Sequence, residues 1–146
     1  LIGALEKIKS YLDYGAVTPI QVAAASALSS DPSTIAKVRE VYKKRRNVLV
    51  DAMSKAGWEI PSPDATMFAW APIPEIFKSL GSLEFSKVLL KEADISVAPG
   101  IGFGEYGENF VRIGLVENEH RIRQAARNIK AVFTKADKIL SDHSPN

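Results

Sequence analysis

The feature that most constrains the fold is a long amphipathic helix predicted over residues 31–57. Asp31 followed by Pro32 supplies the capping oxygen and the fixed backbone angle that are typical of a helix start. Gly57 stands where a C-terminal cap is expected. Residues that define a helical repeat follow at intervals of three and four: Ile35, Val38, Tyr42, Arg45, Leu49, Met53 and Ala56. A helix of this length with one inward face requires other elements to cover that face.

The residues after Gly57 alternate between predicted strands and predicted helices. We expect strands over residues 58–60, 66–71, 95–98 and 110–115, a helix over 82–92 capped by Ser82, and a final helix from 118 to about 140 capped by Asn118. Strands and helices that alternate around one core indicate an α/β or α+β layer. The expected fold class is therefore α/β (an α+β small domain), with a small mixed sheet flanked by helices and preceded by the long helix.

The residues before the long helix predict two shorter helices. Residues 1–9 carry apolar side chains at helical spacing, and Thr18 and Pro19 are expected to cap a second helix over residues 19–29. That second segment is rich in alanine and apolar nearly all round, as in a buried helix. Because the chain opens on an apolar stretch without an initiator methionine or a helix cap, we expect a fragment of a longer protein, with exposed apolar surface around residues 19–29.

Composition excludes several classes of function. The net charge of +2 is too small for a nucleic-acid surface, and the basic run at residues 43–46 is interpreted as a solvated helix face, because no aromatic residues interleave with it. The chain has no cysteine, so disulfides, thiolate metal sites and cysteine nucleophiles are excluded. No apolar run is long enough to span a membrane. His120 and His143 are too far apart for a metal-binding spacing, so we expect no metal.

Residues 97–115 contain the strongest candidate for a functional side chain. A predicted strand ends in a loop with four glycines among residues 100–107, and the next strand carries Arg112 near its centre. Alternation along that strand places Val111, Ile113 and Leu115 on one face and Arg112 on the other. Since the apolar face must be the packed one, Arg112 is expected to project beside the glycine loop.

Two readings of Arg112 remain open from the pattern. A guanidinium fixed on a strand suits recognition of a ligand carboxylate, because its fork makes two parallel charge-assisted hydrogen bonds. The alternative is a salt bridge to Glu105, Glu108 or Glu117, and spacing alone favours this salt bridge. The glycine loop does not decide between them, since no helix follows it and neither a dinucleotide fingerprint nor a P-loop fits.

Three segments together resemble a known family. The arrangement V-A-P-G-x-x-F-G-x-x-G-x-x-x-x-R-I-x-L of residues 97–115 resembles the substrate-carboxylate strand of class I/II (fold type I) aminotransferases. Residues 7–21, with Tyr-Leu-Asp-Tyr-Gly and Thr-Pro-Ile-Gln, are similar to the segment that follows the cofactor lysine in that family. Residues 65–74 are similar to a small-domain strand of the branch acting on alanine or LL-diaminopimelate.

The resemblance implies an organisation into three parts and a set of site residues. Residues 1–30 would finish the large cofactor domain, residues 31–57 would form the inter-domain helix, and residues 58–146 would form the small C-terminal domain. Arg112 would bind the substrate α-carboxylate, with Gly100 and Phe103 near the substrate. Tyr14 would approach the cofactor of the neighbouring subunit.

The resemblance also implies a cofactor and partners. The full-length protein would be a cytoplasmic homodimer that uses pyridoxal 5'-phosphate to transfer an amino group between an amino acid and a 2-oxo acid. The Schiff-base lysine is expected upstream of this chain, because in the family it precedes the Tyr-Leu-Asp-Tyr-Gly segment, so the fragment alone should be inactive. Lys55 follows a serine as a cofactor lysine would, but it falls in the last turn of the long helix and is interpreted as structural. The alternatives are a non-catalytic α/β anion-binding module, or another fold type I enzyme such as a condensing enzyme or a lyase.

Overall fold

The computed structural model describes residues 1–13 and 15–143, and the long helix in it is α3 (Ser33–Ala56). Asp31 starts the helix as predicted, because its carboxylate accepts hydrogen bonds from the Ser33 backbone N–H at 2.9 Å and the Ser33 hydroxyl at 2.6 Å. These two bonds, the hydroxyl first, lower the pKa of the Asp31 carboxyl. Buried positions on the helix are Leu49, Met53 and Ala56.

The basic run on α3 is only partly the solvated face that the sequence predicted. Lys43 and Lys44 are exposed, whereas Arg45 and Arg46 are half-buried. Arg45 donates to the carbonyl oxygens of residues 115 and 116, both at 3.0 Å, and Arg46 donates to that of Pro63 at 3.3 Å. Both arginines therefore join α3 to segments that follow it in the chain.

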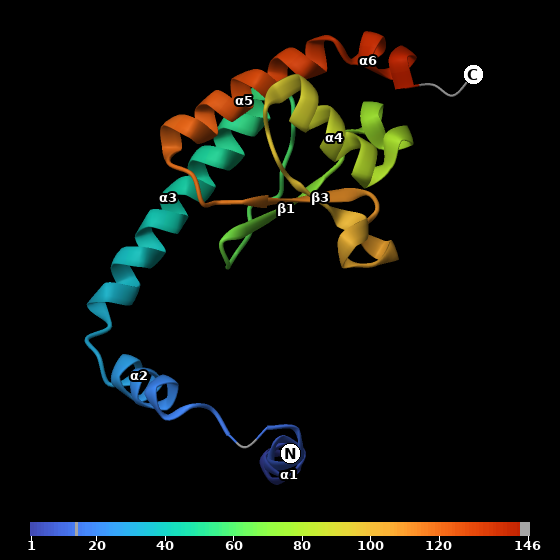
Figure 1. Ribbon diagram of the computed structural model, residues 1–146. Coiled ribbons are helices and arrows are strands. Elements are labelled where there is room, and N and C mark those ends of the chain that lie inside the picture. Colours follow the sequence, from blue (N-terminus) through green and yellow to red (C-terminus); the bar gives the residue numbers. More distant parts are fainter. Residues whose placement is uncertain (14, 144–146) are drawn as a thin grey trace. The chain divides into compact units, whose positions relative to one another are not determined.

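Two helices precede α3 (Figure 1). They are α1 (Ile2–Leu12) and α2 (Thr18–Leu28), and neither holds a buried residue. The predicted break after residue 9 is wrong, because α1 continues to Leu12. Thr18 is the first helical residue of α2 rather than its cap, a position held by Val17. The apolar side chains of α2 are exposed, as expected for residues 19–29.

The chain divides into two compact units, Leu1–Lys37 and Val38–Asn146. The second contains a sheet of three strands, β1 (Phe68–Pro72), β2 (Ala98–Pro99) and β3 (Phe110–Gly114), in the order β1-β3-β2. Both pairings are antiparallel, so the predicted mixed sheet is corrected to an antiparallel one. The fold class itself is confirmed: this unit is a small α/β domain.

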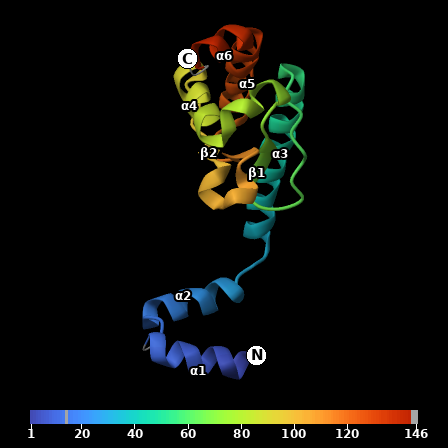
Figure 2. The ribbon, with the colours of Figure 1, turned by 90° about the vertical axis from the view of Figure 1, so that its right-hand side faces the viewer.

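Helices cover one face of this sheet. Ala69, Ala71 and Val111 are fully buried on that face, and Figures 1 and 2 show α4 (Gly81–Ala93) and α5 (Glu119–Thr134) on the same side. The largest buried side chains of the unit are Trp58, Phe77, Phe85, Leu89, Leu115 and Ile129. The opposite face of the sheet carries the segment that follows β2.

Three predicted elements differ from the structure. Residues 58–60 form no strand, although Trp58 and Ile60 are buried and the Trp58 indole N–H donates to the Pro72 carbonyl at 2.7 Å. The strand predicted over 95–98 is limited to the short β2. The final helix is interrupted at Lys135 and continues as α6 (Ala136–His143). The segment before α4 adds a 3-10 helix, η1 (Glu75–Leu80).

Asn118 caps α5 as the sequence predicted. Its side-chain oxygen accepts from the backbone N–H groups of His120 at 3.1 Å and Arg121 at 3.0 Å. We expect Asn118→Ala to lower the free energy of unfolding by about 1 kcal/mol, because both donors lose this acceptor. Urea unfolding followed by circular dichroism measures the change, with Lys130→Ala, at an exposed position on the same helix, as a non-cap comparison. An unchanged midpoint for Asn118→Ala would contradict the assignment.

Candidate functional site

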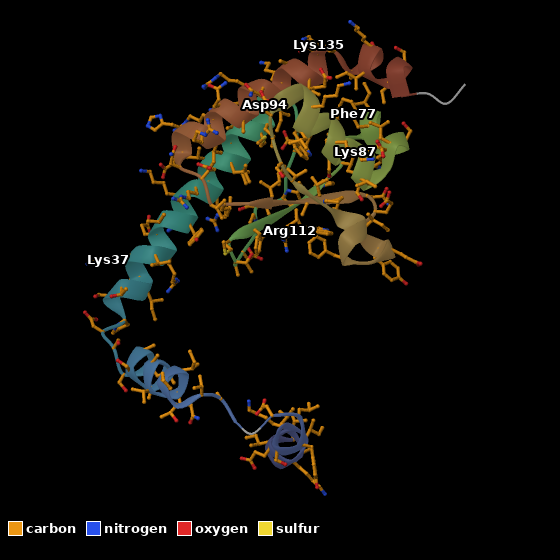
Figure 3. All side chains as sticks on the ribbon, viewed as in Figure 1. Lys37, Phe77, Lys87, Asp94, Arg112 and Lys135 are labelled. Atoms are coloured by element: carbon orange, nitrogen blue, oxygen red, sulfur yellow. The ribbon has the colours of Figure 1, made fainter. Side chains whose placement is uncertain are left out.

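Arg112 lies at the centre of the sheet on its uncovered face. It pairs with Trp70 of β1 and Ala98 of β2. The predicted alternation along the strand is confirmed, since Val111 is fully buried on the helix-covered face while Arg112 is half-buried. Figure 3 shows Arg112 on the side of the strand away from α4 and α5. Two neighbouring strands therefore hold its backbone rigidly.

Two aromatic rings contact the guanidinium, and two more extend the aromatic cluster beside it. The Arg112 Cζ lies 4.3 Å from the ring centroid of Phe68 and 4.5 Å from that of Phe103. Trp70 stands edge-on to Phe103 at 5.6 Å and stacks on Phe110 at 5.5 Å between centroids. We call these five side chains the Arg112 platform. Ring faces attract a cation by about 0.5–1 kcal/mol each at exposed sites, so they hold the charge in place without neutralising it.

Among the described residues, Arg112 does not form the salt bridge that spacing favoured. Within residues 1–13 and 15–143, Arg112 takes part in none of the ion pairs. Of the three candidate partners, Glu108 is bonded to Ser82 instead, and Glu105 and Glu117 are exposed. The guanidinium is thus a cation on an apolar platform, in a position to receive an anion by its N–H groups.

The backbones of Gly100 and Gly107 cross in close contact within the glycine loop. It consists of two short 3-10 helices, η2 (Gly100–Phe103) and η3 (Glu105–Gly107). A Cβ on Gly100 would overlap the backbone oxygens of Gly107 and Phe110, and a Cβ on Gly107 would overlap the backbone of Gly100. Only glycine fits at this crossing, which returns the chain to β3.

A pair of polar side chains fastens this loop to α4. The Glu108 carboxylate accepts from the Ser82 backbone N–H at 3.1 Å and from the Ser82 hydroxyl at 2.8 Å. The same hydroxyl accepts from the Ile101 N–H at 3.0 Å. Ser82 was predicted as the helix cap, but it lies inside the first turn of α4, and Glu108 supplies the capping oxygens. Sequence reasoning missed this pairing because 26 residues separate the two side chains.

The predicted site residues are partly brought together. Phe103 contacts Arg112, as described above, whereas Gly100 is buried at the base of the loop, against Gly107. Tyr14 lies outside the described residues. Lys55 is in the last turn of α3, exposed, and paired with Asp51 at 2.8 Å. Its surroundings fit the structural role that the sequence indicated.

The platform suits an anionic substrate group and does not suit the cofactor that the resemblance implies. Pyridoxal phosphate needs a lysine for the Schiff base and an acid at the pyridine nitrogen. The platform consists of one arginine and four aromatic rings, so it supplies neither group. We therefore derive no step through the cofactor from these residues.

The described residues also bear on metal binding and membrane insertion. Their histidine, aspartate and glutamate side chains form no cluster of three or more that would hold a metal ion. None of their helices is both long enough and apolar enough to cross a bilayer.

Comparison with known proteins identifies the family. Residues 1–129 match the family described as aminotransferase class I and II. This chain belongs to that family. The match confirms the resemblance carried by the glycine loop and the Arg112 strand, and it covers most of both structural units.

Individual relatives give the same answer. The chain is 65% identical over 140 residues to the putative aminotransferase AatC of Rhizobium meliloti, covering 96% of this chain and 35% of the relative. It is 54% identical over 140 residues to the glutamate-pyruvate aminotransferase AlaC of Escherichia coli, covering 96% of this chain and 34% of the relative. The chain thus spans about a third of the length of these relatives.

A solved structure agrees in fold. The apo structure of BacF from Bacillus subtilis matches with a TM-score of 0.78 and 32% sequence identity, covering 90% of this chain and 33% of that one. The sheet and helices described above are therefore arranged as in the corresponding third of that structure.

Proposed function

We propose that this chain forms the C-terminal third of an aminotransferase and supplies the group that binds the substrate carboxylate. The whole protein would transfer an amino group between an amino acid and a 2-oxo acid. The observation that carries the proposal is Arg112, a cation on a rigid central strand that contacts aromatic rings and pairs with no carboxylate among the described residues. Membership of the family supports the reaction class.

The role of Arg112 follows from its geometry. Both substrates of an amino transfer carry an α-carboxylate, and a guanidinium grips a carboxylate with two parallel hydrogen bonds. A two-point grip fixes the orientation of the amino acid, so that its α-carbon faces the reacting group. The Phe68 and Phe103 rings cover part of the half-buried guanidinium, which reduces its hydration and strengthens its attraction to an anion.

Pyridoxal 5'-phosphate would supply the electron sink for this reaction, held by residues outside the platform. We propose that the Schiff-base lysine lies in another part of the protein, so the 146-residue chain alone is inactive. The protein would work as a cytoplasmic homodimer, with Tyr14 near the cofactor of the partner subunit and Gly100 and Phe103 beside the substrate.

The proposed domain organisation has residues 1–30 in the large domain, 31–57 as the connecting helix and 58–146 as the small domain. Two observations support it. The division between the compact units falls after Lys37, within the continuous helix α3, and α1 and α2 bury none of their own residues.

Amino transfer from alanine to 2-oxoglutarate, measured as glutamate formed by the whole enzyme, tests the proposal. The glutamate-pyruvate activity named for the AlaC relative makes this pair the first choice. We expect glutamate formation by the whole enzyme and none by the 146-residue chain. Absence of transfer with alanine, with every other proteinogenic donor and with LL-diaminopimelate would contradict the proposed function.

Calorimetric titration of L-alanine into the 146-residue chain separates this proposal from an independent anion-binding module. We expect binding too weak to measure, because most of the pocket would be missing. Stoichiometric binding at micromolar affinity would favour the binding module.

A further inference from the structure

A buried polar cluster links the glycine loop to α4, and it lies outside the Arg112 platform. We call it the Ser82–Glu108 clasp. Ser82 is fully buried, and its hydroxyl is used twice, donating to Glu108 and accepting from the Ile101 N–H. The Glu108 carboxylate uses both of its oxygens on Ser82, one on the hydroxyl and one on the backbone N–H. Hydrogen bonds therefore connect Ser82, Glu108 and the Ile101 backbone in one cluster.

The surrounding sequence makes room for the clasp. Gly81 precedes Ser82 with a φ of +72°, a conformation that other residues adopt only with strain, and a Cβ there would overlap the Glu108 carboxylate. The carboxylate meets the first turn of α4, where backbone N–H groups and the helix dipole favour negative charge. Loss of this charge would leave polar groups of the cluster without their best partners.

The clasp holds both ends of the segment that carries Phe103. Ile101 follows the first glycine of the Gly100–Gly107 crossing, and Glu108 follows the second. Between these two fixed points the loop projects Phe103, which is 52% exposed and rests on Arg112 and Trp70.

We propose that Ser82 and Glu108 are positioning residues for substrate binding. They hold the loop so that Phe103 stays against the Arg112 guanidinium, and thereby set the affinity for the substrate carboxylate without touching it. This inference rests on the proposed function of Arg112. It assigns a role to a buried serine and a half-buried glutamate that the reaction itself does not require.

The test uses Glu108→Gln and Ser82→Ala in the whole enzyme. Glu108→Gln keeps the shape of the side chain but removes the charge and one acceptor. We expect a roughly 10- to 100-fold rise in KM for the amino donor with a much smaller change in kcat, since small misplacements of positioning groups have effects of this size. Glu105→Gln, on the same loop but exposed, and Ser79→Ala, exposed on η1, are matched controls and should leave KM unchanged.

A double-mutant cycle with Phe103→Ala separates positioning from general stability. If the clasp acts through Phe103, then Glu108→Gln adds little to the KM of Phe103→Ala, because the ring that it positions is already gone. An equal rise in KM in both backgrounds, or no rise in either, would overturn the inference. If Ser82→Ala does not fold, Glu108→Gln and its cycle decide the matter.

Failure of this inference is distinguishable from failure of the proposed function. Arg112→Lys keeps the charge but loses the two-pronged grip, and it should raise KM whether or not the clasp matters. A rise with Arg112→Lys but none with the clasp variants rejects the clasp alone. Unchanged KM with Arg112→Lys and with Arg112→Ala rejects the proposed function, and the clasp with it.

Discussion

Arg112→Ala in the whole enzyme should raise KM for the amino donor by about 30-fold or more. The substrate carboxylate would lose a charged, two-point partner, a loss of roughly 2–5 kcal/mol when the remaining charge stays desolvated. Because Arg112 is half-buried and projects from the uncovered face of the sheet, its truncation leaves the packed core intact. The fold should therefore persist while substrate binding weakens.

Steady-state kinetics across a series of amino donors measures this effect. The visible absorbance of the bound cofactor serves as the control and should be unchanged, since the platform does not hold the cofactor. Phe110→Leu is a milder comparison, because it alters the platform without altering its charge. If KM for every donor stays at the wild-type value in Arg112→Ala, the carboxylate is bound elsewhere.

Gly100→Ala should have the second large effect. Its new Cβ would overlap the carbonyl oxygens of Gly107 and Phe110, which belong to the backbone and have little freedom to move. Accommodating a methyl group in such a close approach costs about 1–3 kcal/mol or more, and the loop must shift to do so. We expect a lower melting temperature together with a raised KM for the amino donor.

Gly102→Ala is the matched control for that experiment. Gly102 lies two residues away in the same 3-10 helix, and a Cβ there would meet nothing within 4 Å. Both variants add the same methyl group to the same loop, so only the Gly100–Gly107 crossing distinguishes them. Equal melting temperatures and equal KM values for the two variants would contradict the role assigned to the crossing.

Local sequence patterns predicted the parts of this structure that depend on local physics. The spacing of Leu49, Met53 and Ala56 gave the inward face of the second half of α3, and Asn118 marked the start of α5. Ile35 and Val38, which follow the same spacing, are exposed. Alternation along β3 placed Arg112 opposite Val111, which is the geometry that the candidate site needs. Each of these depends on side chains within one or two turns, or on neighbours along one strand.

Contacts between distant residues account for the predictions that failed. Ser82 looked like a helix cap, yet its partner Glu108 lies 26 residues further along the chain. Arg45 belonged to a run that looked solvated, but it bonds carbonyls about 70 residues away. Spacing alone favoured a salt bridge for Arg112. That prediction was wrong, because the Glu108 carboxylate accepts hydrogen bonds from Ser82 instead. Local patterns contain no information about which segments fold against each other.

The aromatic surroundings of Arg112 were missed for the same reason. Phe68 and Trp70 come from β1, more than 40 residues before Arg112, and only the antiparallel register of β1 with β3 brings them to it. The signal in the sequence was the alternation of Phe68, Ala69, Trp70 and Ala71, which gives β1 one face of large rings and one of small side chains.

The most direct measurement compares an amino acid substrate with its α-carboxamide in the wild-type enzyme and in Arg112→Ala. The carboxamide keeps the shape of the substrate but lacks the negative charge. If Arg112 binds the α-carboxylate, the wild type should prefer the acid in kcat/KM by a large factor, and Arg112→Ala should lose most of that preference. An undiminished preference for the acid in Arg112→Ala would contradict the account.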